Sequence, residues 1–315
     1  MTVRSCIASL RGAVLSALTA GLMCGSLGCP PSGPQPGVDE TVPPPPPREL
    51  GDIVDRIEQN AVLLDRTLWS PAIQVTARFT DRDAKEHVFN FDGNLLYQPP
   101  RNLRIDLRPG LGDKVMEIGS NQQDYWVWVE PELRGMWWGR HRHLGKPCAE
   151  KILVRPDQLL CALGVGGLPA ESEGLYGPAR KFGKVYDILY YMKRRDEGGF
   201  LLDREYWIDR SAPFQIRVII LRDALGRKTM SAFLDDYRPA WEDGPVVAHK
   251  LSIYWPQDDG WFNLSMLSIR GIADTKVRPK SFDRPTADRL PAAVRAHVVQ
   301  VDADCDPPSS QTDDQ

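Results

Sequence analysis

Histidine, cysteine and carboxylate side chains are the groups in this 315-residue chain that could bind a metal. The strongest local combination is His141-Arg142-His143, with Cys148 a few residues further on. A protein-bound metal needs three or four ligands held in a fixed geometry, and no further ligand follows at a recognised spacing. The neighbouring arginines favour a solvated basic loop. The sequence therefore predicts no metal site.

Catalytic motifs are missing from the sequence as well. It has no G-x-S-x-G elbow and no phosphate-binding P-loop, and the glycines at 164, 166 and 167 do not form a dinucleotide fingerprint. The acidic pairs 235–236 and 258–259 fall at expected strand ends or turns, where exposed acids are ordinary. A net charge of −3 offers no basic footprint for nucleic acid. We expect a protein that is not an enzyme, takes no cofactor and binds no nucleic acid.

Chemical modification of a cysteine has better support. Arg4 and Arg11 precede an uncharged run over residues 12–28 that is rich in Ala and Leu, which is the pattern of an export signal. The run ends with a small residue directly before Cys29, and this ending resembles a bacterial lipoprotein signal, in which that cysteine is lipidated. We predict a signal peptide over residues 1–28 and lipidation of Cys29. Ordinary secretion with cleavage elsewhere is the alternative.

The segment after Cys29 fits a membrane tether. Residues 29–49 include five consecutive prolines at 43–47. Proline-rich chain is extended, at about 3.1 Å per residue, and does not pack into a core. Because Pro30 stands where resembling lipoproteins carry an inner-membrane retention Asp, we expect the outer membrane. The predicted location is the cell envelope, facing the periplasm and anchored to the membrane by lipid.

The cysteines of the body of the chain fit an oxidising compartment. Cys148 and Cys161 form the expected disulfide, and two small buried thiols are the alternative reading. Cys305 is expected to stand alone in a C-terminal tail. That tail covers residues 286–315, with a short helix first and disordered polar chain from Asp302 onward.

The spacing of apolar residues predicts the elements that position these groups. A helix is expected from Leu50, because Ile53, Ile57 and Leu64 recur at helical spacing, and Ser70-Pro71 ends the pattern. A short helix is expected over residues 155–164, with Pro near its start and Gly at its end. Alternating apolar and polar residues predict strands at 75–79, 87–97, 102–108, 114–119, 124–129, 136–138, 184–191, 201–208, 214–221, 229–237, 249–255 and 262–272.

Tight-turn signals between these strands, among them Asp92-Gly93 and Pro109-Gly110, favour an antiparallel meander. Several strands, such as 125–129 and 188–192, are apolar on both faces. Either helices cover the second face, or the sheet curls around an apolar interior. The residues that we select as candidate lining of an apolar cavity are Tyr125, Trp126, Trp128, Trp137, Trp138, Ile188 and Tyr190. Packed core is the alternative for each of them.

The order of these motifs resembles the LolA/LolB lipoprotein-localisation fold. Residues 94–105 (NLLYQPPRNLRI) resemble its strand, proline and next strand, and residues 119–131 resemble its Gly turn and aromatic strand. Residues 155–160 resemble its mid-chain lid helix, and 206–216 its central hairpin. The resemblance covers about residues 50–285. It implies a mainly β α+β domain in which a curved antiparallel half-barrel, lidded by an N-terminal and a mid-chain helix, encloses a cavity for acyl chains.

The resemblance also implies a function. We expect an anchored envelope protein that binds acyl chains of lipoproteins or lipids without covalent chemistry, in outer-membrane lipoprotein sorting. LolA has an Arg before the proline of the first motif, whereas this chain has Pro99-Pro100 followed by Arg101. The lipid anchor is closer to LolB than to the soluble LolA. The alternative is a structural or stress-sensing envelope lipoprotein of the same fold that binds a protein partner.

Overall fold

The structure is a computed structural model. It describes residues 46, 48–80, 86–130, 133–146, 148–149, 152, 154–169, 174–211 and 214–305. The predicted signal peptide, Cys29, most of the tether and residues 306–315 lie outside the described residues.

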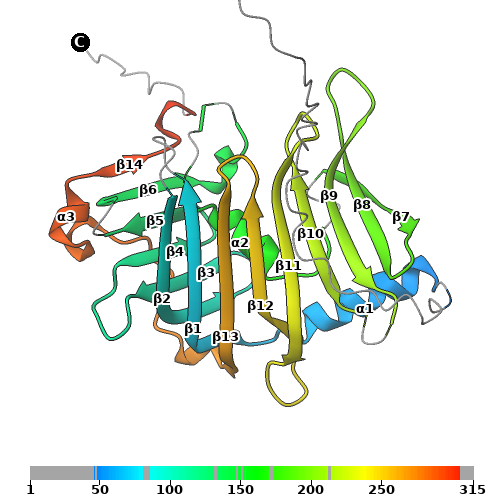
Figure 1. Cartoon of the computed structure of the whole chain (residues 1–315), viewed down its shortest axis with the longest axis horizontal. Helices are drawn as coiled ribbons and strands as arrows, with labels where there is room; N and C mark the ends of the chain where they lie inside the picture. The colour runs from blue at the N-terminus through cyan, green and yellow to red at the C-terminus, as the bar shows by residue number, and fades with distance from the viewer. Residues whose placement is uncertain are drawn as a thin grey trace, which may run out of the picture. The chain divides into compact units, whose positions relative to one another are not determined.

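A single sheet dominates the described chain, with a few short helices (Figure 1). The helices are α1 (Leu50–Val62), α2 (Pro156–Ala162) and α3 (Ala292–Arg295), with 3-10 turns η1 (His141–His143), η3 (Asp274–Lys276), η4 (Ala287–Arg289) and η5 (Ala303–Cys305). The strands are β1 (Thr67–Thr80), β2 (Glu86–Gln98), β3 (Asn102–Arg108), β4 (Met116–Ser120), β5 (Asp124–Val129), β6 (Gly135–Arg140), β7 (Leu175–Phe182), β8 (Tyr186–Arg194), β9 (Phe200–Asp209), β10 (Ile216–Arg222), β11 (Lys228–Pro239), β12 (Val246–Trp255), β13 (Gly260–Ile272) and β14 (Val298–Gln300).

The strands follow a meander in two halves. Strands β1 to β6 run outward from the centre in chain order, β13 back to β7 run outward on the other side, and β1 pairs with β13 at the join. All neighbouring strands are antiparallel except β14, which lies parallel to β6. The predicted antiparallel, mainly β fold class is confirmed.

The sheet curls around α2. This helix contacts β4 and β5 and also β11, although five strands separate β4 from β11 in the sheet order. One short helix can reach both groups only where the strands bend around it. We call the face toward α1 and α2 the inner face, and the opposite one the outer face.

The main hydrophobic core lies on the inner face. In β3, Leu103, Ile105 and Leu107 are buried there, while the residues between them are only partly buried on the other side. Helix α1 contributes Ile53 and Ile57 to the same core. At its centre, the buried Gln158 side chain of α2 accepts a 2.6 Å hydrogen bond from the Trp255 indole N–H. A buried amide with a partner of this kind fixes the helix on the sheet without the cost of an unpaired polar group.

Residues 286–305 pack on the sheet, which corrects the predicted tail over this range. We call residues 286–305 the C-terminal strap. Leu290 and Val294 of the strap cover the outer face of β5 and β6, where they form a second buried cluster with Trp126, Trp128 and Met136. The predicted short helix is α3, but disorder from residue 302 is wrong for 302–305, which end in η5. Apolar side chains on both faces of β5 require this second cover.

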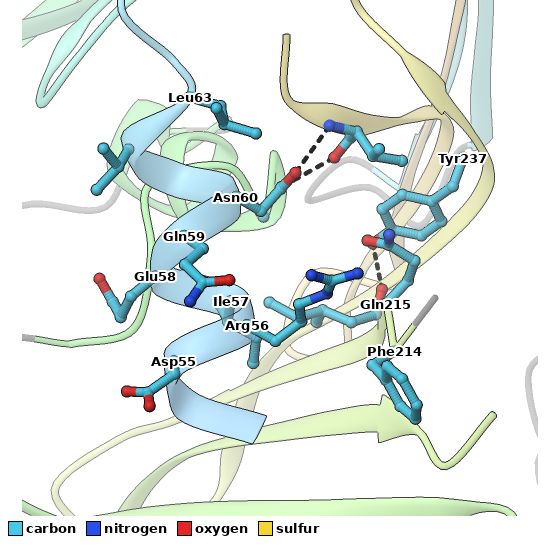
Figure 2. Close-up of a pocket in the computed structure, with 14 residues that line it drawn as sticks. Asp55, Arg56, Ile57, Glu58, Gln59, Asn60, Leu63, Phe214, Gln215 and Tyr237 are labelled. Carbon is cyan, nitrogen blue, oxygen red and sulfur yellow. Dashed lines mark hydrogen bonds between the residues drawn. The ribbon is translucent and has the colours of Figure 1, made fainter. Parts of the chain in front are cut away.

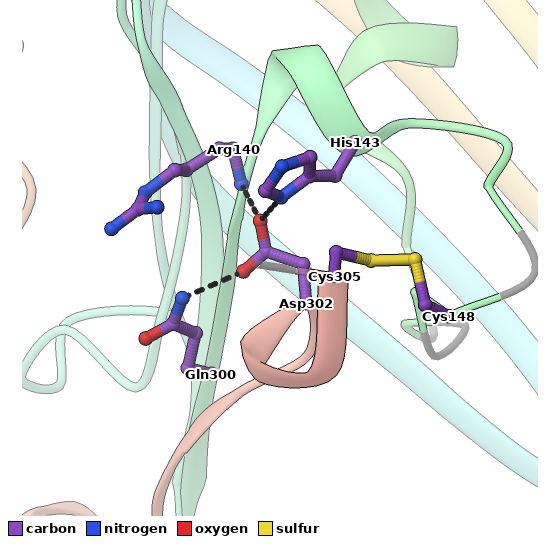
Figure 3. The surroundings of a disulfide bond; sticks show 6 residues. All are labelled: Arg140, His143, Cys148, Gln300, Asp302 and Cys305. Carbon is purple, nitrogen blue, oxygen red and sulfur yellow. Dashed lines mark hydrogen bonds and ion pairs between the residues drawn. A yellow bond between two sulfur atoms is a disulfide. The ribbon is translucent and has the colours of Figure 1, made fainter. Parts of the chain in front are cut away.

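The disulfide that holds the strap also differs from the prediction. Cys148 is bonded to Cys305, with a Cα–Cα distance of 5.2 Å (Figure 3). Cys161 is in α2, where its Sγ lies 3.9 Å from the Tyr206 hydroxyl. The expected Cys148–Cys161 bond is therefore wrong. Sequence spacing does not determine connectivity, and here the strap brings a distant cysteine to Cys148 while helix packing turns Cys161 toward β9.

Asp302 fixes the end of the strap from within (Figure 3). Its fully buried carboxylate accepts hydrogen bonds from the Arg140 backbone N–H at 2.9 Å and the Gln300 amide at 3.0 Å, and it pairs with His143 Nδ1 at 2.6 Å. Burial raises the pKa of this carboxyl, but the hydrogen bonds outweigh burial and hold its pKa below the usual range. Near the end of the strap, Asp302 is therefore a buried and ionised carboxylate.

Gly93 shows where a turn signal misleads. The predicted Asp92-Gly93 turn lies inside β2, where Gly93 pairs with both Ile73 and Leu107. A Cβ at Gly93 would lie 2.1 Å from the Asp106 carbonyl oxygen. The glycine is there because two backbones approach closely, a role glycine also plays in strands.

We predict that Cys305→Ser lowers the free energy of unfolding by about 2–5 kcal/mol, because a closed loop of this length strongly restricts the unfolded chain. Denaturant unfolding under non-reducing conditions measures the effect. Cys161→Ser is the matched control and is expected to change stability by much less. Equal losses in the two variants, or a disulfide-linked peptide that contains Cys161, would contradict the assignment.

We predict that Asp302→Asn costs about 1.5–3 kcal/mol of stability at pH 7, the range for hydrogen bonds to a charged group. Because the folded pKa of Asp302 is lowered, its contribution is complete above the ordinary carboxyl pKa and disappears as pH falls through the folded value. Unfolding curves at pH 7 and pH 3 should show a gap between wild type and variant that narrows in acid. A gap of the same size at both pH values would show that ionised Asp302 is not the source of the stability difference.

Candidate functional site

A groove lies between α1 and the adjoining ends of strands β10, β11 and β12 (Figure 2). Its volume is about 700 Å³, within the range of roughly 300–1,000 Å³ that is usual for small-molecule sites. We call it the α1 groove. Its lining residues are Asp55, Arg56, Ile57, Glu58, Gln59, Asn60, Val62, Leu63, Gly164, Phe214, Gln215, Ile216, Tyr237 and Val246.

Helix α1 forms one wall because it is amphipathic. Ile53 and Ile57 are buried against the core, while Asp52 and Asp55 are exposed on the other side. At the end of the helix the pattern changes, because Val62 is 78% exposed and Leu63 is 46% exposed. Apolar residues therefore stand at the solvent-facing rim of the groove.

Two polar contacts hold this wall in place. The Asn60 side chain donates to the Val246 carbonyl at 3.0 Å and accepts from the Val246 N–H at 2.8 Å. Glu58 accepts the Leu168 N–H at 2.7 Å. Because Val246 begins β12 and Leu168 lies in the loop after α2, these bonds tie α1 to two separate parts of the domain. The groove therefore has a wall of defined position.

The floor of the groove is apolar with its polar atoms paired. Tyr237 donates its hydroxyl to the Ile216 carbonyl, and burial raises the pKa of this phenol far above its usual value, which keeps it a donor. Gly164 has a φ of 66°, and a Cβ there would lie 2.6 Å from Leu234 Cδ2. Glycine fits both constraints at this point.

Phe214, two residues before β10, is held in an unusual backbone conformation. Its φ of 61° is in the left-handed region, which costs a non-glycine residue about 1–3 kcal/mol. The ring lines the groove, and the Arg48 guanidinium carbon lies 3.9 Å from the ring centroid. Backbone strain of this size persists only where the surrounding packing enforces it, so Phe214 is firmly placed.

The seven predicted cavity residues lie elsewhere. In β5 and β6, Tyr125 and Trp137 face the main core, whereas Trp126, Trp128 and Trp138 point to the outer face under the strap. Consecutive residues of a strand alternate between faces, so neighbouring aromatic residues cannot share one interior.

The same alternation separates the two predicted residues of β8. Leu189 and Tyr191 belong to the main core, and Ile188 and Tyr190 therefore point outward, Ile188 opposite Trp207. None of the seven lines the α1 groove. This corrects the prediction that they surround one cavity. The sequence signal that marks the real groove is weaker: two apolar residues, Val62 and Leu63, continue past the buried face of the first helix.

The two loop histidines have separate partners. His141 Nε2 lies 3.0 Å from the Ser120 hydroxyl, and His143 pairs with Asp302. Burial lowers the pKa of His141, which favours the neutral ring. Among the described residues, no three His, Cys, Asp or Glu side chains come together as metal ligands.

A second pocket lies at the opposite ends of β8 to β11, beside the start of α2, with a volume of about 590 Å³. Several of its charged residues form ion pairs within the lining, among them Arg155 with Asp157 at 2.8 Å and Arg204 with Asp203 at 2.9 Å. The lining of the α1 groove is the more apolar of the two.

In the part of the chain that the structure describes, no helix has the length and apolar character to cross a bilayer.

No protein-family model and no curated protein sequence matches this chain. It is similar in structure to a LolA superfamily protein from Nitrosomonas europaea, at 11% identity and a TM-score of 0.44 over 74% of this chain and 97% of that one. A domain assigned provisionally to outer membrane lipoprotein sorting in Vibrio parahaemolyticus matches at 13% identity and 0.45 over 72% and 94%. A DUF1329 family protein from Desulfovibrio piger matches at 12% and 0.47 over 74% and 95%. The LolA/LolB-like fold remains what the sequence motifs resemble, and the curved antiparallel sheet with helices on its inner face agrees with it.

We predict that Asn60→Ala frees the end of α1, because it removes both hydrogen bonds to Val246 and leaves the partly buried N–H and carbonyl of that residue without their partner. The expected loss of stability is about 1–3 kcal/mol. Hydrogen exchange measured by mass spectrometry should become faster in residues 50–62. Gln59→Ala, one position away on the exposed side, is the control. Equally faster exchange in both variants would show that the Asn60–Val246 hydrogen bonds do not hold the end of α1.

Proposed function

We propose that this chain is a membrane-anchored envelope lipoprotein that binds an acyl chain non-covalently in the α1 groove. The observation that carries the proposal is the groove itself, an open space with an apolar floor of Ile216, Tyr237 and Val246 and an apolar rim at Leu63. Binding without catalysis agrees with the lack of a recognised catalytic motif in the sequence.

The chemistry of such a site is favourable and reversible. Each methylene transferred from water to an apolar site contributes about 0.8 kcal/mol. A chain that leaves a bilayer is already in hydrocarbon, so its exchange into the groove is close to neutral in free energy. That balance suits a protein that takes up lipid and gives it back.

The packed interior limits how much lipid the protein holds. Leu95, Ile118 and Phe262, with α2 above them, fill the centre of the inner face. The cargo therefore lies under α1 at one side of the domain, where the polar residues of the helix can face water. A short length of chain fits this space better than a fully enclosed multi-chain lipid.

The anchor completes the proposal. Lipidation at Cys29, with residues 30–47 as an extended spacer, would hold the domain within reach of an outer-membrane surface on the periplasmic side. A groove on a tethered domain can meet lipid or lipoprotein cargo repeatedly without leaving the membrane. The role in lipoprotein sorting rests on this combination.

A second candidate function is a structural or sensing lipoprotein that binds a protein partner through the same rim. The packing of the five predicted aromatic residues of β5 and β6 into buried clusters, and the exposure of Val62, favour it. It predicts a stable envelope neighbour in crosslinking and no saturable acyl binding.

We predict that the full-length protein binds a fluorescent C16 fatty-acid probe saturably, and that Gln59→Trp weakens binding at least tenfold by filling the groove from α1. Gln59 is exposed and lines the groove, so the helix should accept the indole. Fluorescence titration below the probe's critical micelle concentration measures the dissociation constant.

Asp52→Trp places the same indole on α1 outside the groove and serves as the control. It should bind the probe as wild type does. No saturable binding by wild type, or equal weakening by the two tryptophans, would end the acyl-binding proposal.

A further inference from the structure

Two arginines flank the Phe214 end of the α1 groove. Arg48 precedes α1, and its guanidinium group stacks on the Phe214 ring. The backbone carbonyl of Arg48 accepts a hydrogen bond from Arg180, whose mostly buried side chain pairs with Asp187 at 2.9 Å. The backbone at Arg48 is thereby tied to β7 and β8. The Arg48 guanidinium group has a defined place over the ring that lines the groove.

Arg56 approaches from α1. It lines the groove, and Figure 2 shows its guanidinium group extending from the helix toward Gln215. Within the described residues no ion pair involves Arg56. A guanidinium group offers a planar set of donors that fits a carboxylate or phosphate.

The acidic residues of the groove wall do not neutralise this end. Glu58 is engaged with the Leu168 N–H. Figure 2 shows the Asp55 carboxylate on the opposite side of α1 from the Arg56 guanidinium group. Glu49 and Asp52 are exposed to solvent near the start of the helix and are not part of the lining. The Phe214 end of the groove therefore keeps the positive charge of Arg48 and Arg56, next to the apolar floor.

We propose that the preferred ligand is a single-chain anionic amphiphile, with its carboxylate or phosphate between Arg48 and Arg56 and its tail along Ile216, Tyr237 and Val246. The inference rests on the proposed acyl-binding function and narrows it. Phe214 lies between the head-group region and the tail region, because the Arg48 guanidinium group stacks on its ring and the ring also lines the groove. An uncharged acyl compound would occupy the tail region alone.

The test compares three C12 ligands on the full-length protein by isothermal titration calorimetry at low ionic strength: dodecanoate, dodecyl phosphate and dodecanol. Wild type should bind at least one of the anions more tightly than the alcohol. The double variant Arg48→Gln/Arg56→Gln should bind that anion roughly 3- to 10-fold more weakly, the range for exposed charge pairs, and the alcohol unchanged. Loss for dodecanoate alone assigns a carboxylate head group, and loss for dodecyl phosphate alone assigns a phosphate.

Arg78→Gln removes an exposed arginine away from the groove, where it lies 3.5 Å from Glu86, and controls for general attraction of anions. It should leave all three affinities as they are. Equal binding of anions and alcohol, with no change in the double variant, overturns the head-group inference and leaves acyl binding intact. If none of the three binds wild type, the proposed function itself fails.

Discussion

The contact of α2 with both halves of the sheet is the interaction on which the rest of the structure depends. Because one short helix contacts β4, β5 and β11, the sheet must bend around it, and the bend creates an inner face. Gln158, Leu159 and Ala162 then occupy the middle of that face. The space that remains beside α2 is divided, with an apolar groove under α1 and a charged pocket at the other end of the strands.

This arrangement decides which parts of the chain are available for binding. The centre of the domain is filled by its own side chains, so a ligand site has to form at the margin, where Asn60 and Glu58 tie α1 to the start of β12 and to the loop after α2. A helix fixed by these polar contacts, over an apolar floor, gives a groove that is defined in shape and still open to water. The disulfide and Asp302 serve a different purpose, since they hold the strap on the outer face.

Much of the fold could be predicted from the sequence because alternation of apolar residues is local. The first helix, the short helix at Pro156 and most strands follow from it. What failed depends on contacts between distant residues. Trp126 and Tyr125 look alike as neighbours in an apolar run, yet strand geometry sends them to opposite faces. Cys305 lies 157 residues from Cys148, and no local signal joins them.

The groove could not be predicted for the same reason. Ile216, Tyr237 and Val246 come from three strands, and only the sheet order brings them under α1. The exposed Val62 and Leu63 are the local hint, and they are ambiguous without the strand ends opposite them.

The central claim is that lipid enters beneath α1 and not the middle of the sheet. Photo-crosslinking with a diazirine fatty acid, followed by peptide mapping, tests it most directly. We expect labelling in residues 55–63 and 214–216, and we expect unlabelled fatty acid to compete with it. Competable labelling of residues 124–138 in its place, or labelling that excess fatty acid does not reduce, would contradict it.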